Sequence, residues 1–259
     1  MEIHILGCWA QSIPIKMDPL EDFRKAIEAS EKFGAHFRQQ IEAFNKHFER
    51  LQEQFVQIGK SFEKLPDSMA QLANHGWYTT MVMTPGQTNY LANEIYKKHW
   101  RKVDNYLMEL LQRDLNKIKR TLIERHPNRA KILRSAFKNH LRKDYNSSIP
   151  LFLTQADGIC FESIKTKLYS TENKGVPKIS KIIKELPPGS FSSLMLGPLL
   201  KQRLITATEI KRDDFSGTLN RHDIFHGISL DYGSKVNSFK SISWIQYISE
   251  SLSKFFKKE

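Results

Sequence analysis

The string LNRHDIFHG, residues 219–227, places an arginine and two histidines within a stretch of six residues. The guanidinium of Arg221 stays charged at physiological pH and can donate paired hydrogen bonds to phosphate oxygens. The imidazole of His226 titrates near neutral pH, so it can take a proton from a hydroxyl group or give one to a leaving oxygen. These residue types could therefore cleave a phosphodiester, with the 2′-hydroxyl group of RNA as the nucleophile.

The spacing of this pair is weak evidence by itself. Arg120–His126 and Arg134–His140 also fit a pattern of Arg followed by His after four to six residues. Those two pairs lie inside long amphipathic helical patterns, whereas His226 is followed at once by Gly227, a residue type that ends helices. The surroundings therefore single out Arg221 and His226 as the candidate pair.

The string Arg221-His222-x3-His226 resembles the motif of the HEPN superfamily, in which Arg is usually followed by a polar residue and then by His. The longer string LNRHDIFHGISLDYGSKVNSFK is similar to a group of bacterial HEPN-like proteins of undefined biology. The upstream string IPLFLTQADGI and a helix with the pattern NRA…AF have similar counterparts in those proteins. The resemblance covers about residues 88–259 and leaves the N-terminal segment outside.

This resemblance implies a helical bundle that dimerises, so that two Arg/His motifs meet across the interface and cleave RNA without a metal ion. Arg221 and His226 are then the catalytic residues, RNA is the substrate, a homodimer is the active form, and an antitoxin or defence protein is a candidate partner. HEPN proteins include toxins, anticodon nucleases and CRISPR-associated effectors, and some members have lost the chemistry and only bind. Ile228 stands where one toxin branch has Tyr, so the regulation peculiar to that branch is not implied.

Helix geometry gives an independent reason to expect a dimeric site. An unbroken helix would place Arg221 and His226 roughly 140° apart around its axis. A helix end at Gly227, or a second protomer, would remove this mismatch. His222 and His226 share a helix face, but no third zinc ligand is apparent, so no metal or cofactor is predicted. The alternative is that both histidines continue an apolar stripe and are hydrogen-bonded core residues.

Further polar residues are candidates to support the site. Asp157 lies in an apolar stretch and needs a partner if it is buried. We expect it to orient Arg221 or a histidine, unless it forms another internal ion pair or lies on an exposed side. Asn220 could hold the motif backbone or contact RNA, and Tyr232 fits either the site or the core. The predicted supporting residues are Asn220, His222, Asp157, Asp231 and Tyr232.

The positive charge of the chain is concentrated in one segment. The formal net charge is +12, and residues 97–143 contain 15 Lys or Arg and 4 Asp or Glu, a local net charge of +11. A phosphate backbone is the natural partner of such a segment, and Lys117, Lys119 and Arg120 are the predicted nucleic-acid-binding residues. The alternative is a solvated helix face, or one that meets an acidic protein.

The N-terminal third predicts one long helix from Pro19 to Leu65. Its apolar positions alternate steps of four and three residues, a heptad pattern typical of coiled coils. Asp18 is the predicted N-cap, and Pro66 is predicted to end the helix. The heptad positions, which could pack on a second copy or within the same chain, are Phe37, Ile41, Phe44, Phe48, Leu51, Phe55, Ile58, Phe62 and Leu65.

The rest of the chain also predicts helices, and no β pattern is convincing. We predict three parts: residues 1–66 as the N-terminal tail and heptad helix, 67–87 as a linker, and 88–259 as a HEPN-like helical domain. The predicted helices of that domain cover residues 89–124, 129–142, 151–168, 178–186, 190–204, 209–226 and 237–256.

Composition narrows the class of protein. Cys8 and Cys160 are the two cysteines, so neither a disulfide framework nor a cysteine-rich zinc site is expected. No apolar run approaches the roughly 18 residues that span a bilayer, and residues 1–17 lack the features of a signal peptide, so we expect a cytoplasmic location without membrane contact. The helical patterns predict an all-α protein, and the HEPN resemblance implies a metal-independent endoribonuclease in phage defence or a toxin-like system. The alternative is a non-catalytic RNA-binding or scaffolding helical protein.

Overall fold

The computed structural model describes residues 19–172, 175–209, 211–215 and 217–253. These residues form helices and connecting loops, and one isolated β-bridge, between Thr171 and Pro177, is the β-type pairing seen among them. The predicted all-α fold is therefore confirmed for the described part of the chain. None of the helices described is long and apolar enough to cross a membrane. The chain divides into two units, Met1–Gln57 and Ile58–Glu259.

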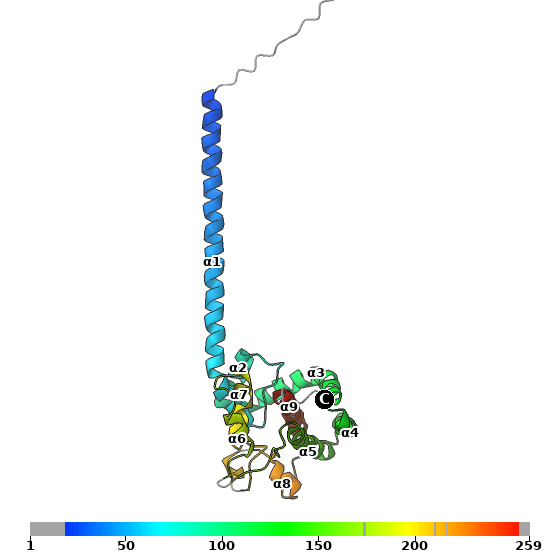
Figure 1. Cartoon of the computed structure of the whole chain (residues 1–259). Helices are drawn as coiled ribbons and strands as arrows, with labels where there is room; N and C mark the ends of the chain where they lie inside the picture. The colour runs from blue at the N-terminus through cyan, green and yellow to red at the C-terminus, as the bar shows by residue number, and fades with distance from the viewer. Residues whose placement is uncertain (1–18, 173–174, 210, 216, 254–259) are drawn as a thin grey trace, which may run out of the picture. The chain divides into compact units, whose positions relative to one another are not determined.

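Helix α1 spans Pro19–Asn74 and includes the whole heptad pattern (Figure 1). The predicted start at Pro19 is confirmed, whereas its predicted N-cap, Asp18, lies outside the described residues. Lys25 forms an ion pair of 3.0 Å with Glu21, one turn earlier. A glutamate that precedes a lysine by four residues stabilises an isolated helix by a few tenths of a kcal/mol, roughly 0.2–0.5.

The predicted helix end at Pro66 is wrong, because α1 continues through this proline to Asn74. A proline inside a helix costs about 3 kcal/mol. The turns after Pro66 bury Met69 and Leu72, each of which is 1% exposed. Burial of a large apolar side chain contributes about 1.5–3 kcal/mol, so two such side chains offset the cost of the proline. The segment predicted as a linker is thus partly helical and belongs to the core.

The second unit contains the end of α1 and the elements from α2 to α9. The elements and their bounds are α2 (Pro85–Tyr96), α3 (Trp100–Arg125), η1 (Pro127–Arg129), α4 (Ala130–Leu141), α5 (Tyr145–Ile164), α6 (Ile179–Lys184), α7 (Phe191–Leu196), η3 (Gly197–Leu200), η4 (Arg212–Asp214), α8 (Arg221–Phe225) and α9 (Lys235–Ser251).

Residues 89–124, predicted as one helix, instead lie in two helices, α2 and α3. Lys98 has a φ of 64°, in the left-handed region, and the His99 N–H donates to the Glu94 carbonyl oxygen at 2.9 Å. This is the hydrogen-bonding pattern of a helix C-terminus. The break lets the Glu94 carboxylate accept hydrogen bonds from the side chains of His99 and Lys102, at 3.1 and 3.0 Å.

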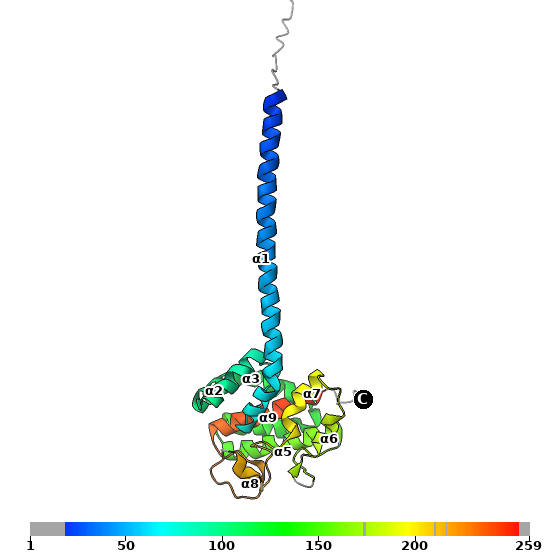
Figure 2. The same ribbon diagram turned by 90° about the vertical axis from the view of Figure 1, so that its left-hand side faces the viewer.

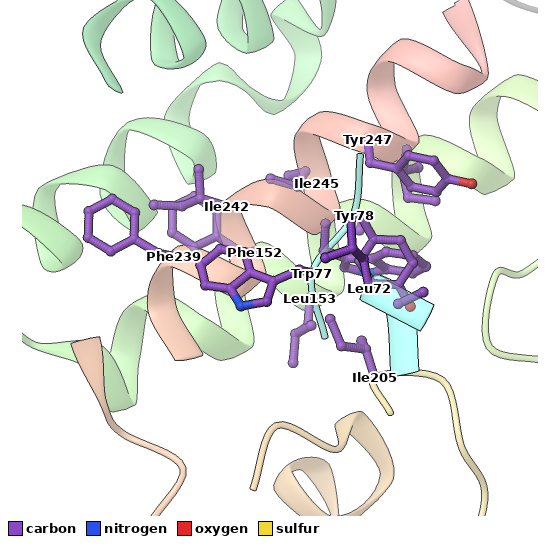
Figure 3. Packing of buried hydrophobic residues seen from close by; sticks show 14 of the residues in the cluster. Leu72, Trp77, Tyr78, Phe152, Leu153, Ile205, Phe239, Ile242, Ile245 and Tyr247 are labelled. Atoms are coloured by element: carbon purple, nitrogen blue, oxygen red, sulfur yellow. The ribbon is translucent and has the colours of Figure 1, made fainter. Parts of the chain in front are cut away.

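The core of the second unit is built around α9, which packs against α3, α5 and α7 (Figure 2). The side chains of α9 are buried on almost all sides. Aromatic residues from distant parts of the chain meet there: Trp77 and Tyr78 follow α1, and Phe152 belongs to α5 (Figure 3). Because Trp77 is 1% and Tyr78 3% exposed, the segment after α1 is part of this core.

The helix predicted over residues 209–226 is also wrong. This segment contains η4 and α8, separated by loop residues. Gly217 has a φ of 142°, which L side chains rarely adopt, and a Cβ at this position would lie 3.1 Å from the Leu204 side chain. The chain therefore cannot run on as a helix here, and Leu219 enters the core instead.

Candidate functional site

The candidate Arg/His string forms α8, a short helix that packs against α5. Asn220 is its N-cap: the side-chain oxygen accepts a hydrogen bond from the Asp223 N–H at 3.1 Å. The Asn220 amide nitrogen donates to the carbonyl oxygens of Leu204 and Ala207, at 3.0 and 3.1 Å. Asn220 is 4% exposed, and the three partners of its side chain are backbone groups. Its side chain thus fixes the residue at which α8 begins.

The Arg221 guanidinium contacts two aromatic rings. Its Cζ lies 4.8 Å from the ring centroid of Tyr169 and 5.3 Å from that of Phe225. Its Nε is buried without a hydrogen-bond partner, and among the described residues no carboxylate forms an ion pair with it. Charged groups in proteins are ordinarily paired when they lose contact with water. Arg221 is thus a half-buried cation that lacks a protein counter-ion in the described part of the chain.

Tyr169 is fixed beneath Arg221. Its hydroxyl group donates to the Leu153 carbonyl oxygen at 3.0 Å and accepts from the Trp244 Nε1–H at 2.8 Å. Burial raises the pKa of the Tyr169 hydroxyl well above its usual range. The phenol therefore stays neutral, and its ring presents a rigid face to the guanidinium, an arrangement that favours cation–π attraction.

The two histidines lie side by side at the end of α8. The His222 and His226 ring centroids are 4.4 Å apart, and the His226 N–H donates to the His222 carbonyl oxygen at 3.0 Å. Gly227 has a φ of 70° and turns the chain, as its type predicted. His222 is half-buried and His226 is exposed, so the alternative in which both are core residues does not hold for His226.

Within the described residues, these histidines do not belong to a group that could hold a metal ion. In the described part of the chain, no group of three or more His, Cys, Asp or Glu side chains is placed to hold a metal ion. Cys160, on α5, is buried. Burial, and then the charge of Asp157, raise the pKa of the Cys160 thiol to about 12, so this cysteine is an inert packing residue.

Asp157 does not orient Arg221 or a histidine through a hydrogen bond, contrary to the prediction. Its Oδ1 accepts from the Leu168 N–H at 2.6 Å. After α5 the chain reverses at Lys165, whose φ is 55°, and this brings the Leu168 amide back to the carboxylate. Asp157 thus positions the loop that carries Tyr169, and it supports Arg221 only indirectly.

Asp231 and Tyr232 lie on the segment that leads from α8 to α9. Asp231 is exposed. The Tyr232 hydroxyl group donates to the Asn146 carbonyl oxygen at 3.1 Å, and its ring packs at the edge of the core. The observed contacts of Tyr232 therefore fit the core alternative.

The basic segment places Lys and Arg side chains on α3 and α4, helices that pack against each other. Lys117 and Arg120 are exposed and Lys119 is half-buried. On α4, Lys131, Arg134 and Lys138 are exposed at helical spacing. Within the described residues no acidic side chain forms an ion pair with any of these six. We call these six residues the basic face.

Some other cations of the same segment are paired with carboxylates. The Glu94 carboxylate binds Lys97, His99 and Lys102 at distances of 3.7, 3.1 and 3.0 Å. These hydrogen bonds, from Lys102 and then His99, lower the pKa of Glu94 to about 2. Arg129 is bound to Glu162 at 2.7 Å. The basic face is thus one part of the solvent-facing positive charge of this segment, to which exposed residues such as Lys98, Arg101 and Lys143 add.

Two residues of the arginine environment escaped sequence reasoning. Phe225 follows Arg221 by four residues, so the helical spacing could have indicated the contact. Tyr169 belongs to a loop far upstream, and no local pattern connects it to α8. Comparison of the chain with models of protein families, with curated proteins and with solved structures gave no match.

Proposed function

We propose that this chain is an endoribonuclease in which Arg221 binds the scissile phosphate and His226 transfers protons. The observation that carries the proposal is the environment of Arg221. Its half-buried cation lies over the rings of Tyr169 and Phe225, has no ion-pair partner among the described residues, and is next to the α8 histidines. A rigid guanidinium with unused donors is suited to a phosphate group, which it can bind through two parallel hydrogen bonds.

The reaction would use groups that the chain and RNA provide. The 2′-hydroxyl group attacks the phosphorus atom, a neutral imidazole takes its proton, and the bond from phosphorus to the 5′-oxygen breaks. A protonated imidazole gives a proton to that oxygen. Arg221 would stabilise the added negative charge of the transition state. The products would be a 2′,3′-cyclic phosphate and a free 5′-hydroxyl, and no metal is needed to generate the nucleophile.

A second copy of the chain fits the surface around α8. Phe225, Ile228 and Leu230 are 40%, 52% and 87% exposed and flank the histidines. Adjacent exposed apolar side chains of this kind are typical of interaction sites. A homodimer that covers them would bring two Arg/His pairs together, as the HEPN resemblance implies.

The direct test is incubation of total RNA with the purified protein in the presence of EDTA. Loss of one general acid–base group lowers rates by roughly a hundred- to ten-thousand-fold, so we expect His226→Ala to abolish visible cleavage. Arg221→Lys should be nearly as inactive, because lysine lacks the planar fork. Matched controls are His36→Ala and Arg50→Lys, exposed positions on α1 that should leave activity unchanged.

Three results would contradict the mechanism: cleavage by His226→Ala at the wild-type rate, products that end in a 3′-hydroxyl, and complete inhibition by EDTA. Tryptophan fluorescence of the variants verifies that the core around Trp77 and Trp244 is intact. Mixing Arg221→Ala with His226→Ala protein should restore part of the activity if each active site combines residues from two copies.

The second candidate function is RNA binding without cleavage. It is favoured by the same packing of Arg221, because stacking between Tyr169 and Phe225 is also a structural role for a guanidinium. The basic face would then carry the function. RNA that binds to folded wild-type protein, but stays intact under all conditions, would select this candidate.

A further inference from the structure

The first unit of the chain exposes a row of apolar side chains along α1, interrupted at Ser30 and Gly34. We call this row the outer seam, and all its residues lie between Pro19 and Gln57. Their exposed fractions range from 37% for Leu51 to 71% for Phe55. The rings of Phe44 and Phe48, one turn apart, have centroids 6.4 Å apart and stack within the helix. The outer seam consists of Phe23, Ile27, Phe37, Ile41, Phe44, Phe48, Leu51 and Phe55.

The steps between these residues define the kind of partner. From Phe37 to Phe55 they alternate four and three without interruption. This period of 3.5 residues keeps a seam facing another helix only if both helices wind around each other in a left-handed coiled coil. The partner is therefore a helix with the same repeat.

Between Ile41 and Phe55 the charged residues of α1 avoid the positions that flank the seam. Between Ile41 and Phe55 the positions next to the seam carry Asn45, His47, Gln52 and Gln54. The charged residues of this stretch lie on the opposite side of the helix: Glu42, Lys46, Glu49, Arg50 and Glu53. In coiled coils, complementary charges at the flanking positions select a different partner chain, and like charges there oppose self-pairing. Between Ile41 and Phe55 the flanking positions carry no Lys, Arg, Asp or Glu, so charges there neither select a different partner chain nor oppose self-pairing.

The charges on the opposite side need no partner from another chain. Glu21 and Lys25 pair within the helix at 3.0 Å. Glu28 and Lys32, and also Glu42 and Lys46, have the same spacing of four residues. These pairs stabilise a single helix. The part of α1 that needs another chain to bury it is therefore the outer seam.

The size of the seam matches a specific interface. A Phe or comparable side chain buries about 150–250 Å², so a residue at half exposure offers roughly 100 Å². Eight such residues give roughly 800 Å² per helix, which is about what each partner contributes to a standard interface. We infer that α1 associates along the outer seam with α1 of a second copy of this chain, as a homotypic coiled coil.

The test is the mass of the full-length protein in solution, measured by light scattering at micromolar concentration. The wild type should have at least twice the monomer mass of 30.2 kDa. The triple variant Phe44→Ser, Phe48→Ser, Phe55→Ser should lose at least half of the wild-type mass. A matched variant on the opposite side, Glu42→Ser, Lys46→Ser, Glu49→Ser, should keep it, since the number of serines introduced is the same.

Two further measurements separate lost association from lost folding. Tryptophan fluorescence should show Trp77 and Trp244 still buried in the triple variant, because both belong to the second unit. The single variant Phe48→Lys, which places a charge in the seam, should weaken association with little loss of helix content.

A wild type that stays at 30.2 kDa would overturn the inference and mean that another protein or a membrane covers the seam. A triple variant that keeps the wild-type mass would also overturn it, and would place any association in the second unit. Because mass is measured without RNA, failure here is distinct from failure of the proposed endoribonuclease.

Discussion

Acid should destabilise the fold through two buried histidines that face serines of α9. His126 follows α3, and its Nε2 lies 2.8 Å from the Ser249 Oγ. His140 belongs to α4, and its Nδ1 lies 2.8 Å from the Ser238 Oγ. Burial, and then the charge of Arg125, lower the pKa of His126 to about 4. Burial and then Lys235 lower the pKa of His140 to about 4.

The sign and size follow from linkage. Each imidazole has a pKa of 6.5 when the chain is unfolded and about 4 when it is folded. Below pH 6.5 the unfolded chain binds more protons, so stability is fully present above that pH and is lost as the pH falls toward 4. At 1.36 kcal/mol per pKa unit, lowering the pH from 7 to 5 removes about 2 kcal/mol for each histidine. The sum, roughly 4 kcal/mol, is a large part of a typical stability of about 5–15 kcal/mol.

The assay is guanidinium unfolding at pH 7 and pH 5, followed by tryptophan fluorescence. The double variant His126→Gln, His140→Gln keeps polar groups beside Ser249 and Ser238 but cannot titrate, so its loss of stability between the two pH values should be smaller by several kcal/mol. Glu250 has the opposite effect, because burial raises the pKa of its carboxyl group, and it is unchanged in the variant. An equal pH dependence in wild type and double variant would refute the assignment.

Two further predictions concern Arg129 and the basic face. Gly158→Ala would bring a Cβ into the Arg129 guanidinium, which is bonded to Glu162 and Gln155. We therefore expect a loss of about 1–2 kcal/mol in the free energy of unfolding. In an Arg129→Ala background the same change should stabilise by about 0.5–1 kcal/mol, and destabilisation in both backgrounds would contradict the reasoning. For RNA binding, each lost phosphate contact should flatten the slope of log K against log salt by roughly 0.7. Changing three residues of the basic face to Gln should therefore flatten this slope. An unchanged slope would mean that these side chains are solvated by water and do not contact RNA phosphates. The substitutions are at Lys117, Lys119 and Arg120, and the controls on α1 are at Lys25, Lys32 and Lys46.

Features set by local chemistry could be predicted from the sequence. The all-α fold and the start of α1 follow from apolar periodicity and from Pro19. Gly227 turns the chain because glycine adopts a positive φ at low cost. The basic face could be predicted by counting charges along the sequence. The ion pairs that Glu94 and Glu162 form with other cations could not be predicted, because the fold determines which side chains meet.

Features set by tertiary packing could not be predicted. Pro66 is accepted within α1 because the turns after it enter the core. The break at Lys98 depends on backbone geometry that a lysine does not indicate. Asp157 meets the Leu168 amide because the chain reverses after α5, and the same reversal brings Tyr169 beneath Arg221. In each case a long-range contact decides the outcome over the local preference.

The position of α9 in the chain has a consequence for biosynthesis. This helix packs against α3, α5 and α7, and all of them leave the ribosome before it does. Until α9 emerges, the surfaces of α3, α5 and α7 that pack against it have no partner. These surfaces therefore stay exposed to solvent in the nascent chain. The helix α1, by contrast, is complete early and needs no later segment for its outer seam. On the inference that the outer seam pairs with a second copy, neighbouring nascent chains on one messenger RNA would pair through α1 before either core has closed, so that assembly would precede folding.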